Sequence, residues 1–181
     1  MFGLNMVVHK GKTIFVGDTS VHEYPTSKQL SEIAISSARV VRLFGFDPKV
    51  AFVSHSTFGQ PLTSRTKHIK EAVDILKEKK VDFEFDGDMQ PDVALNEEYK
   101  SLYPFSKIVG NANILIMPGQ HSAAISYKMM KTLGDTKVIG PLLIGLGLPI
   151  EIAPLRSSIS EIINLASIAA YSADVINYKK N

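Results

Sequence analysis

The chain contains no cysteine and no tryptophan, and the missing cysteine excludes several kinds of site. Without it there is no disulfide bond, no zinc–thiolate centre and no thiol nucleophile. No apolar run approaches the ~20 residues of a membrane-spanning helix, and the first eight residues lack the pattern of a signal peptide. The net charge is only +2 and the basic residues are dispersed, so no stripe for nucleic acid is present. We therefore expect a cytoplasmic protein that binds neither nucleic acid nor a membrane.

The length of 181 residues fits one domain, or one domain plus a piece of another, and a hydrophobic share of 45% is enough for a sizeable core. Strand-like and helix-like apolar patterns alternate along the chain. Strands are predicted over residues 6–9, 13–16, 50–54, 83–85, 114–117, 136–139 and 149–153, and helices over 26–44, 64–80, 122–133 and from 159 onward. This order predicts an α/β fold of three layers, with helices on both faces of a largely parallel sheet.

The first long helix has the clearest signals. Thr26 and Gln29 have the spacing of a capping box, and Gly45 follows the last periodic residue. Its apolar stripe predicts one buried face, which consists of Leu30, Ile33, Ala34, Ser37, Ala38 and Val41. The final helix carries a second apolar stripe, made of Ile159, Ile162, Ile163, Ala166, Ala169 and Ala170.

Four segments carry a family resemblance: Asp86-Gly-Asp-Met-Gln-Pro-Asp-Val-Ala-Leu95, Asn113-Ile-Leu-Ile-Met-Pro118, His121-Ser-Ala-Ala-Ile-Ser-Tyr-Lys128 and Val138-Ile-Gly-Pro-Leu-Leu-Ile-Gly145. Together they resemble the phosphate acetyl/butyryltransferase family, and most closely its branch fused to the C-terminus of bacterial NADP-dependent malic enzymes. The resemblance runs from about residue 15 to residue 173. It implies a fold like that of isocitrate and isopropylmalate dehydrogenases. It also implies that residues 1–148 form the second subdomain, and that residues 149–181 are the returning strand and helix of the first.

Four predicted strand ends offer a place for the anionic groups of acetyl-CoA, because ligands of open α/β sheets bind beyond the carboxyl ends of strands. The candidate binding residues are Ser54, Ser56, Thr57, Met89, Gln90, His121, Ser122, Gly140 and Pro141. Helix capping is an equally good explanation for any single serine, and core packing for Met89. The histidines at strand ends, His55 and His121, could act as bases, although a structural hydrogen bond is the commoner role.

No metal site is predicted. The five histidines do not have the spacing of metal ligands. Three carboxylates, Asp86, Asp88 and Asp92, could hold a divalent cation, but their spacing does not match a calcium loop, and turn or capping roles are sufficient.

The resemblance implies a degenerate catalytic segment near the end of the chain. Active phosphotransacetylases carry a serine and an arginine that steady the thiolester and phosphate, followed by an aspartate that acts as base. Aligned on Ser158, these positions hold Pro154, Leu155 and Glu161. Proline and leucine cannot replace the missing groups, and Arg156 lies one position out of register. Glu161 keeps a carboxylate, yet it lies three residues after Ser158, which is the spacing of a capping box.

The sequence therefore favours a regulatory domain that senses acetyl-CoA over a transferase. In this interpretation NADP, a divalent metal and the oxidative decarboxylation of malate to pyruvate belong to an N-terminal part outside this chain. The alternatives are a fragment of a phosphate acetyl- or butyryltransferase, and a structural module without a ligand. Ala124 departs from the family, which carries asparagine there. We also expect a homodimer or higher homo-oligomer, because the helices at 26–44 and 122–133 carry more apolar surface than one sheet face covers.

Overall fold

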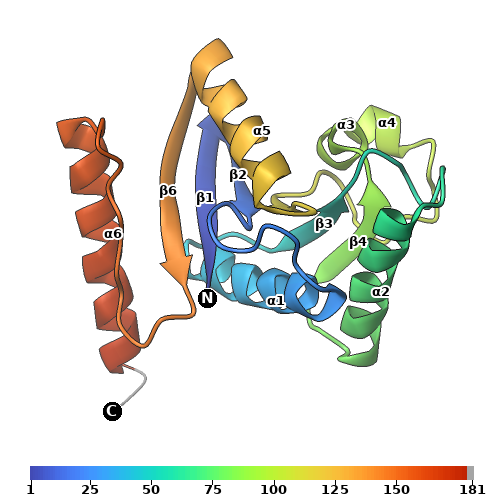
Figure 1. Ribbon diagram of the computed structural model, residues 1–181, viewed down its shortest axis with the longest axis horizontal. Helices are drawn as coiled ribbons and strands as arrows, with labels where there is room; N and C mark the ends of the chain where they lie inside the picture. The colour runs from blue at the N-terminus through green and yellow to red at the C-terminus, as the bar shows by residue number, and fades with distance from the viewer. Residues whose placement is uncertain (179–181) are drawn as a thin grey trace.

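The computed structural model describes residues 1–178, with the side chains of Arg65 and of residues 174–178 left aside. Six strands form one sheet in the order β4-β3-β5-β2-β1-β6 (Figure 1). Their bounds are Phe2–His9 (β1), Lys12–Gly17 (β2), Lys49–Val53 (β3), Glu84–Met89 (β4), Ile114–Ile116 (β5) and Thr136–Ile144 (β6). Strands β4, β3, β5 and β2 are parallel, whereas β1 is antiparallel to both of its neighbours. The prediction of a largely parallel sheet is confirmed.

Helices cover both faces of this sheet. They span Ser27–Leu43 (α1), Ser64–Glu78 (α2), Pro91–Leu95 (α3), Glu97–Lys100 (α4), Gln120–Leu133 (α5) and Ile159–Tyr178 (α6). The core on one face joins α1 and α2 to strand residues such as Phe15 and Phe52, and the core on the other joins α3 and α5 to Val16 and Ala51. Because successive strand residues point to opposite faces, one alternating sequence builds both cores.

The first hairpin and the first long helix form as predicted. Strands β1 and β2 meet at a tight turn in which Lys10 and Gly11 both have positive φ angles of 47° and 77°. Helix α1 begins with the Thr26–Gln29 capping box, and all six residues of its predicted stripe are buried. That stripe is core, so α1 leaves little apolar surface for a partner.

The end of the chain differs from the sequence prediction. The strand expected over 149–153 is reduced to a single bridge between Leu142 and Glu151, whereas β6 continues beyond the predicted 136–139 to Ile144. Helix α6 forms, but its predicted stripe does not enter the core. Among its described side chains only Leu165 is buried, while Ile159, Ile162 and Ile163 are exposed. Figure 1 shows α6 standing at the outer side of β6.

Candidate functional site

Two of the four predicted ligand loops are strand residues rather than loops. Gly140 and Pro141 lie in the middle of β6, and Asp86, Gly87 and Asp88 lie within β4. The strands predicted over 83–85 and 136–139 are therefore too short at their C-terminal ends. Gly140 has a φ of 127°, and a Cβ atom there would stand 2.5 Å from Oδ1 of the buried Asn5. Close contact with β1, rather than a ligand, is a sufficient reason for this glycine.

The segments after β3 and β4 do come together. The amide N–H of Gln90 donates to Oγ1 of Thr57 at 3.2 Å, and its side-chain amide donates to the carbonyl of His55 at 2.9 Å. The hydroxyl of Ser56 donates to Asp88. Ser54, Ser56, Thr57 and Met89 are all buried, so these hydroxyl groups hold the two segments to each other.

A second group surrounds a small cavity of about 70 Å³ between α5, β6 and the start of α6. It brings Gly140 and Pro141 next to Pro154 and Glu161. The carboxylate of Glu161 is fully engaged: Nζ of Lys131 lies 2.7 Å away, and the amide N–H of Ser158 donates at 2.7 Å. The capping box of Ser158 and Glu161 therefore forms.

These contacts decide what Glu161 can do chemically. The hydrogen bond from Lys131, followed by those from Ser158, lowers the pKa of Glu161 from 4.5 to about 2. A carboxylate with so low a pKa is a poor acceptor for a proton near neutral pH. Glu161 is thus held as an ion-pair partner, in the place where the resemblance implies a base.

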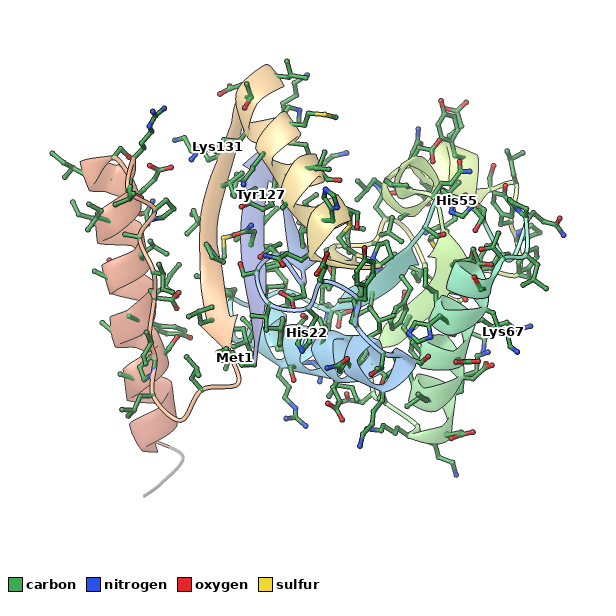
Figure 2. All side chains as sticks on the ribbon, viewed as in Figure 1. Met1, His22, His55, Lys67, Tyr127 and Lys131 are labelled. Atoms are coloured by element: carbon green, nitrogen blue, oxygen red, sulfur yellow. The ribbon has the colours of Figure 1, made fainter. Side chains whose placement is uncertain are left out.

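The two groups lie far apart. Strands β3 and β6 are four places apart in the sheet, and neighbouring strands are about 4.8 Å apart, which puts roughly 19 Å between them. Figure 2 shows the same separation, with His55 on the side of α3 and α4 and with Lys131 and Tyr127 on α5 at the other side. The candidate residues therefore do not form one compact site.

The remaining candidates, His121 and Ser122, lie at the start of α5, where the connections of two neighbouring strands leave on opposite faces of the sheet. Strands β2 and β5 are neighbours, but the helix after β2 (α1) packs on one face and the helix after β5 (α5) on the other. Such a switch point opens a crevice at the carboxyl ends of the strands, where α/β proteins bind ligands. The first turn of α5 begins there, and its N-cap, Gly119, provides no side-chain cap. His121 is exposed beside these amide groups, while the hydroxyl of Ser122 donates back to the Gly119 carbonyl.

Sequence reasoning missed an aspartate–histidine pair in this crevice. Asp18 follows β2 and is only 1% exposed. Its carboxylate accepts N–H bonds from Gly3, Ser20, Val21 and His22, and Nδ1 of His22 lies 2.6 Å away. Because a carboxylate only accepts hydrogen bonds, Nδ1 of His22 carries the proton of this bond. The available signal was a short one, an aspartate at a strand end with a histidine four residues later.

The loop of this pair is fixed against α5. The amide N–H of Gln120 donates to the His22 carbonyl at 2.9 Å, and a Cβ atom on Gly119 would stand only 2.3 Å from the Glu23 carbonyl. Glycine is required by this close approach of two backbones. The described residues include no group of three or more His, Asp or Glu that could hold a metal ion. None of the described helices is long and apolar enough to cross a membrane.

Known proteins share the sequence and the fold of this chain. The family model described as phosphate acetyl/butaryl transferase matches residues 1–170. The chain belongs to this family. Its relatives include the NADP-dependent malic enzyme of Rhizobium meliloti, 46% identical over 173 residues, which are 96% of this chain and 23% of that protein. The phosphate acetyltransferase of Bacillus subtilis is 33% identical over 169 residues, which are 92% of this chain and 52% of that protein.

Solved structures give the same fold. A phosphotransacetylase from Streptococcus pyogenes has a TM-score of 0.89 and 31% identity, and the match covers 95% of this chain and 53% of that one. The EutD phosphotransacetylase from Staphylococcus aureus has a TM-score of 0.87 and 30% identity, with 95% and 54% covered. The phosphotransacetylase-family chain thus spans about a quarter of the length of the Rhizobium meliloti malic enzyme and about half of that of the Bacillus subtilis acetyltransferase.

Proposed function

We propose that this phosphotransacetylase-family chain is the C-terminal regulatory part of an NADP-dependent malic enzyme, and that it binds acetyl-CoA without turning it over. The observation that carries the proposal is the segment from Pro154 to Glu161. It has a proline and a leucine where the resemblance implies the serine and arginine of a transferase, and its carboxylate is bound to Lys131. The oxidation of malate to pyruvate, with NADP and a divalent metal, would belong to the rest of such an enzyme.

The size of the expected losses supports a non-catalytic role. Removing one group that stabilises developing charge costs on the order of 3 kcal/mol, or about a hundredfold in rate. Two such groups are missing here, and the side chain of Leu155 is fully exposed to solvent. The low pKa of Glu161, about 2, removes the third participant as an effective base. Together these changes leave little of the chemistry that a transferase needs.

The residues present fit acetyl-CoA only in part. The hydroxyl groups of Ser54, Ser56 and Thr57 are buried and already bonded within the protein. The better placed residues are His121, which is exposed, and Gln90, which is half-buried and uses one side-chain donor for the His55 carbonyl. The uncapped first turn of α5 can offer amide N–H groups to a phosphate. We infer that the ligand contacts the crevice between β2 and β5 through His121 and Ser122.

The division into two subdomains is supported by the surface near the end of the chain. Seven large apolar side chains are exposed between residues 148 and 163, and they are Leu148, Ile150, Ile152, Leu155, Ile159, Ile162 and Ile163. Exposed apolar side chains gathered in one segment are typical of a contact with another protein surface. We propose that the described part of the segment 149–181 packs against the first subdomain of the complete fold, while residues 1–148 form the second; residues 179–181 lie outside the described residues.

Two measurements test this function. The purified chain, incubated with acetyl phosphate and coenzyme A, is expected to form no acetyl-CoA above a control without protein, and robust turnover would overturn the regulatory proposal. A full-length parent enzyme is expected to bind acetyl-CoA in titration calorimetry. Substituting His121→Ala and Gln90→Ala should weaken that binding, with exposed Glu32→Ala as the control. An active, folded parent that does not bind acetyl-CoA would leave only a structural module.

The second candidate is a fragment of a phosphate acetyl- or butyryltransferase. It is favoured by the coverage of about half of the Bacillus subtilis acetyltransferase and by the close match to two phosphotransacetylase structures. The encoding reading frame distinguishes the two candidates. A malic-enzyme half upstream supports the regulatory proposal, and an upstream segment with only the remaining transferase sequence supports the alternative.

A further inference from the structure

We propose that the cavity between α2 and the edge strand β4 binds a nucleoside phosphate, with the base against aromatic side chains and the phosphate groups against lysines. The cavity has a volume of about 460 Å³, within the range of about 300–1,000 Å³ that is usual for small-molecule pockets. It lies at the edge of the sheet, where β4 is two places beyond β5 (Figure 1). None of the residues proposed to bind acetyl-CoA lines it, so its occupation is independent of the proposed function.

One end of this cavity is formed by aromatic and aliphatic side chains. The ring centroids of Phe58 and Phe105 lie 4.8 Å apart, and Tyr103 packs against both rings. Phe105 is 64% exposed, and Leu62, which also lines the cavity, is 70% exposed. A flat ring placed against these side chains removes apolar surface from water, and aromatic rings favour stacked or edge-to-face contacts with each other.

The aromatic end is held in place by backbone hydrogen bonds. Phe58 has a φ angle of 51°, a left-handed conformation that is uncommon for a bulky residue. Its amide N–H donates to the Asp88 carbonyl at 2.6 Å, and the N–H of Gly59 donates to the Asp88 carboxylate at 3.0 Å. Residues held in such rare conformations cluster at ligand sites. Because the ring is fixed before a ligand arrives, less conformational entropy is lost on binding.

The other end of the cavity is basic. Lys70 and Lys77 line it from α2, and their spacing of seven residues places them on one side of the helix, about 10 Å apart along its axis. Lys107 lines it from the segment after α4. Lys77 pairs with Asp74 at 2.6 Å, whereas the ammonium groups of Lys70 and Lys107 have no partner among the described residues. Two lysines are therefore free to bind phosphate oxygens.

Two buried carboxylates line the same cavity, and the protein already uses both. Asp86 accepts the N–H of the next residue at 3.0 Å and that of Lys107 at 2.8 Å. Asp88 accepts the hydroxyl of Ser56 and the N–H of Gly59. Each of the four oxygen atoms has a donor, so no metal ion is needed to satisfy them. Since the aspartates are buried and the three lysines are exposed, a ligand meets the positive groups first.

A ligand with both a flat ring and an anionic group explains the two ends together. Inorganic phosphate would leave Phe105 and Leu62 in water, and an uncharged ring would leave the lysines unpaired. The ends are anchored at Asp88 and Asp86, which are two residues apart on β4 and hence about 7 Å apart along the strand. The base and the phosphate groups of a nucleotide are separated by a ribose, which is of similar length.

Titration calorimetry of the 181-residue chain with GDP tests this proposal, because GDP lacks the adenine of coenzyme A. We expect GDP to bind with a Kd of roughly micromolar size. Guanosine and pyrophosphate, which each lack one half of the ligand, should bind at least about tenfold more weakly. Raising the salt concentration should weaken the binding of GDP but not that of guanosine.

Substitutions assign the binding to this cavity. Lys70→Ala, Lys107→Ala and Phe105→Ala should each raise the Kd for GDP about tenfold. The matched controls are Lys67→Ala, on α2 but outside the cavity lining, and Tyr99→Ala, an exposed aromatic residue that is also outside it (Lys67 is labelled in Figure 2). These controls should leave the Kd within about twofold. Circular dichroism checks that all variants fold, as expected for changes at exposed side chains.

The variant His121→Ala shows which of the two proposed sites GDP occupies. Unchanged binding of GDP supports the cavity, and loss of binding would place GDP in the acetyl-CoA crevice and overturn the proposal. It is also overturned if GDP does not bind at about millimolar concentration, if Lys70→Ala and Phe105→Ala bind GDP as the wild type does, or if pyrophosphate binds as tightly as GDP. Calorimetry of the full-length parent with acetyl-CoA tests the proposed function separately, because none of these results requires acetyl-CoA binding to be lost.

Discussion

We expect Glu151 to make this protein less stable as the pH rises from 4.5 to about 7. Replacing Glu151 with glutamine should remove most of this loss of stability. The carboxyl group lies between β6 and α6, beside a small cavity lined by Leu142, Ile168 and Tyr171. Its Oε2 atom is buried and has no hydrogen-bond partner among the described residues. Burial raises the pKa of Glu151 from 4.5 to about 7, and a hydrogen bond with the Leu143 backbone offsets only part of this.

The sign of the effect follows from proton binding. Between pH 4.5 and 7 the folded protein keeps the proton on Glu151, whereas the unfolded chain releases it. Stability therefore falls as the pH rises through this window, and it changes no further above pH 7. A shift from 4.5 to about 7 corresponds to at most ~3.4 kcal/mol at 1.36 kcal/mol per unit. The group is only about half-buried, so solvent screening reduces the expected effect to about 1–2 kcal/mol.

Urea unfolding followed by circular dichroism measures this difference. Glu151→Gln should have the stability of the wild type at pH 4 and should exceed it by about 1–2 kcal/mol at pH 8, which is ~2–8 °C in Tm. Glu32→Gln removes an exposed carboxylate from α1 and changes the net charge equally. If Glu151→Gln and the wild type show parallel stability curves from pH 4 to 8, the assigned burial of this carboxyl group is wrong.

Two further substitutions test other buried or paired charges. Lys131→Ala should let the pKa of Glu161 rise from about 2 toward 4.5, as measured by an NMR carboxyl titration. The free energy of unfolding should change by less than ~1 kcal/mol, because the ion pair is exposed. An unchanged titration would contradict the assigned ion pair. Nζ of Lys100 is buried without a hydrogen-bond partner among the described residues, and desolvation lowers the pKa of this lysine. Lys100→Met should therefore stabilise the protein by about 1–3 kcal/mol at pH 7. This gain should shrink as the pH rises toward 10.5, because the folded wild type releases the lysine proton before the unfolded chain does. Equal gains at pH 7 and 10.5 would refute this prediction.

Local sequence rules predicted the first half of the fold well, because the signals there are strong and agree with each other. The stripe of α1 is buried and its capping box forms, and the helix predicted over 64–80 forms as α2 with Ile69, Val73 and Leu76 buried. The hairpin of β1 and β2 also formed where Gly11 permits a tight turn. Periodicity and caps depend on residues close in sequence, so they are visible without the fold.

The end of the sheet was not predictable in the same way. Gly140 and Pro141 normally end a strand, and here β6 continues past them through an irregularity in the ladder, because β1 pairs with β6 on both sides, at Ile139 and at Leu142. The segment 149–153, expected to be a strand, contacts the sheet only at the bridge from Glu151 to Leu142 of β6. How many residues of an apolar segment join a sheet is decided by tertiary contacts, and local propensity does not contain this information.

The orientation of single side chains in the candidate site was also not predictable from the sequence. Asp18 and His22 form a buried pair because the chain turns sharply after β2 and five hydrogen-bond donors converge on one carboxylate. The hydroxyl residues after β3 lie at a strand end as predicted, yet the hydroxyl groups of Ser56 and Thr57 face inward and hold Asp88 and Gln90. The direction in which a polar side chain points, and the group to which it hydrogen-bonds, depend on neighbours distant in sequence. The sequence alone does not show which residues these neighbours are.

The uneven burial of the helices argues that two different surfaces remain to be covered. Helices α1 and α2 contribute to one deep core, while α5 and α6 each bury a single described side chain, Ala123 and Leu165. Those two residues belong to opposite faces of the sheet, so one flat partner cannot cover both helices at once. A protein stabilised mainly by removing apolar surface from water gains from covering each face. Covering α5 and α6 therefore needs two separate contacts, which do not compete for the same residues.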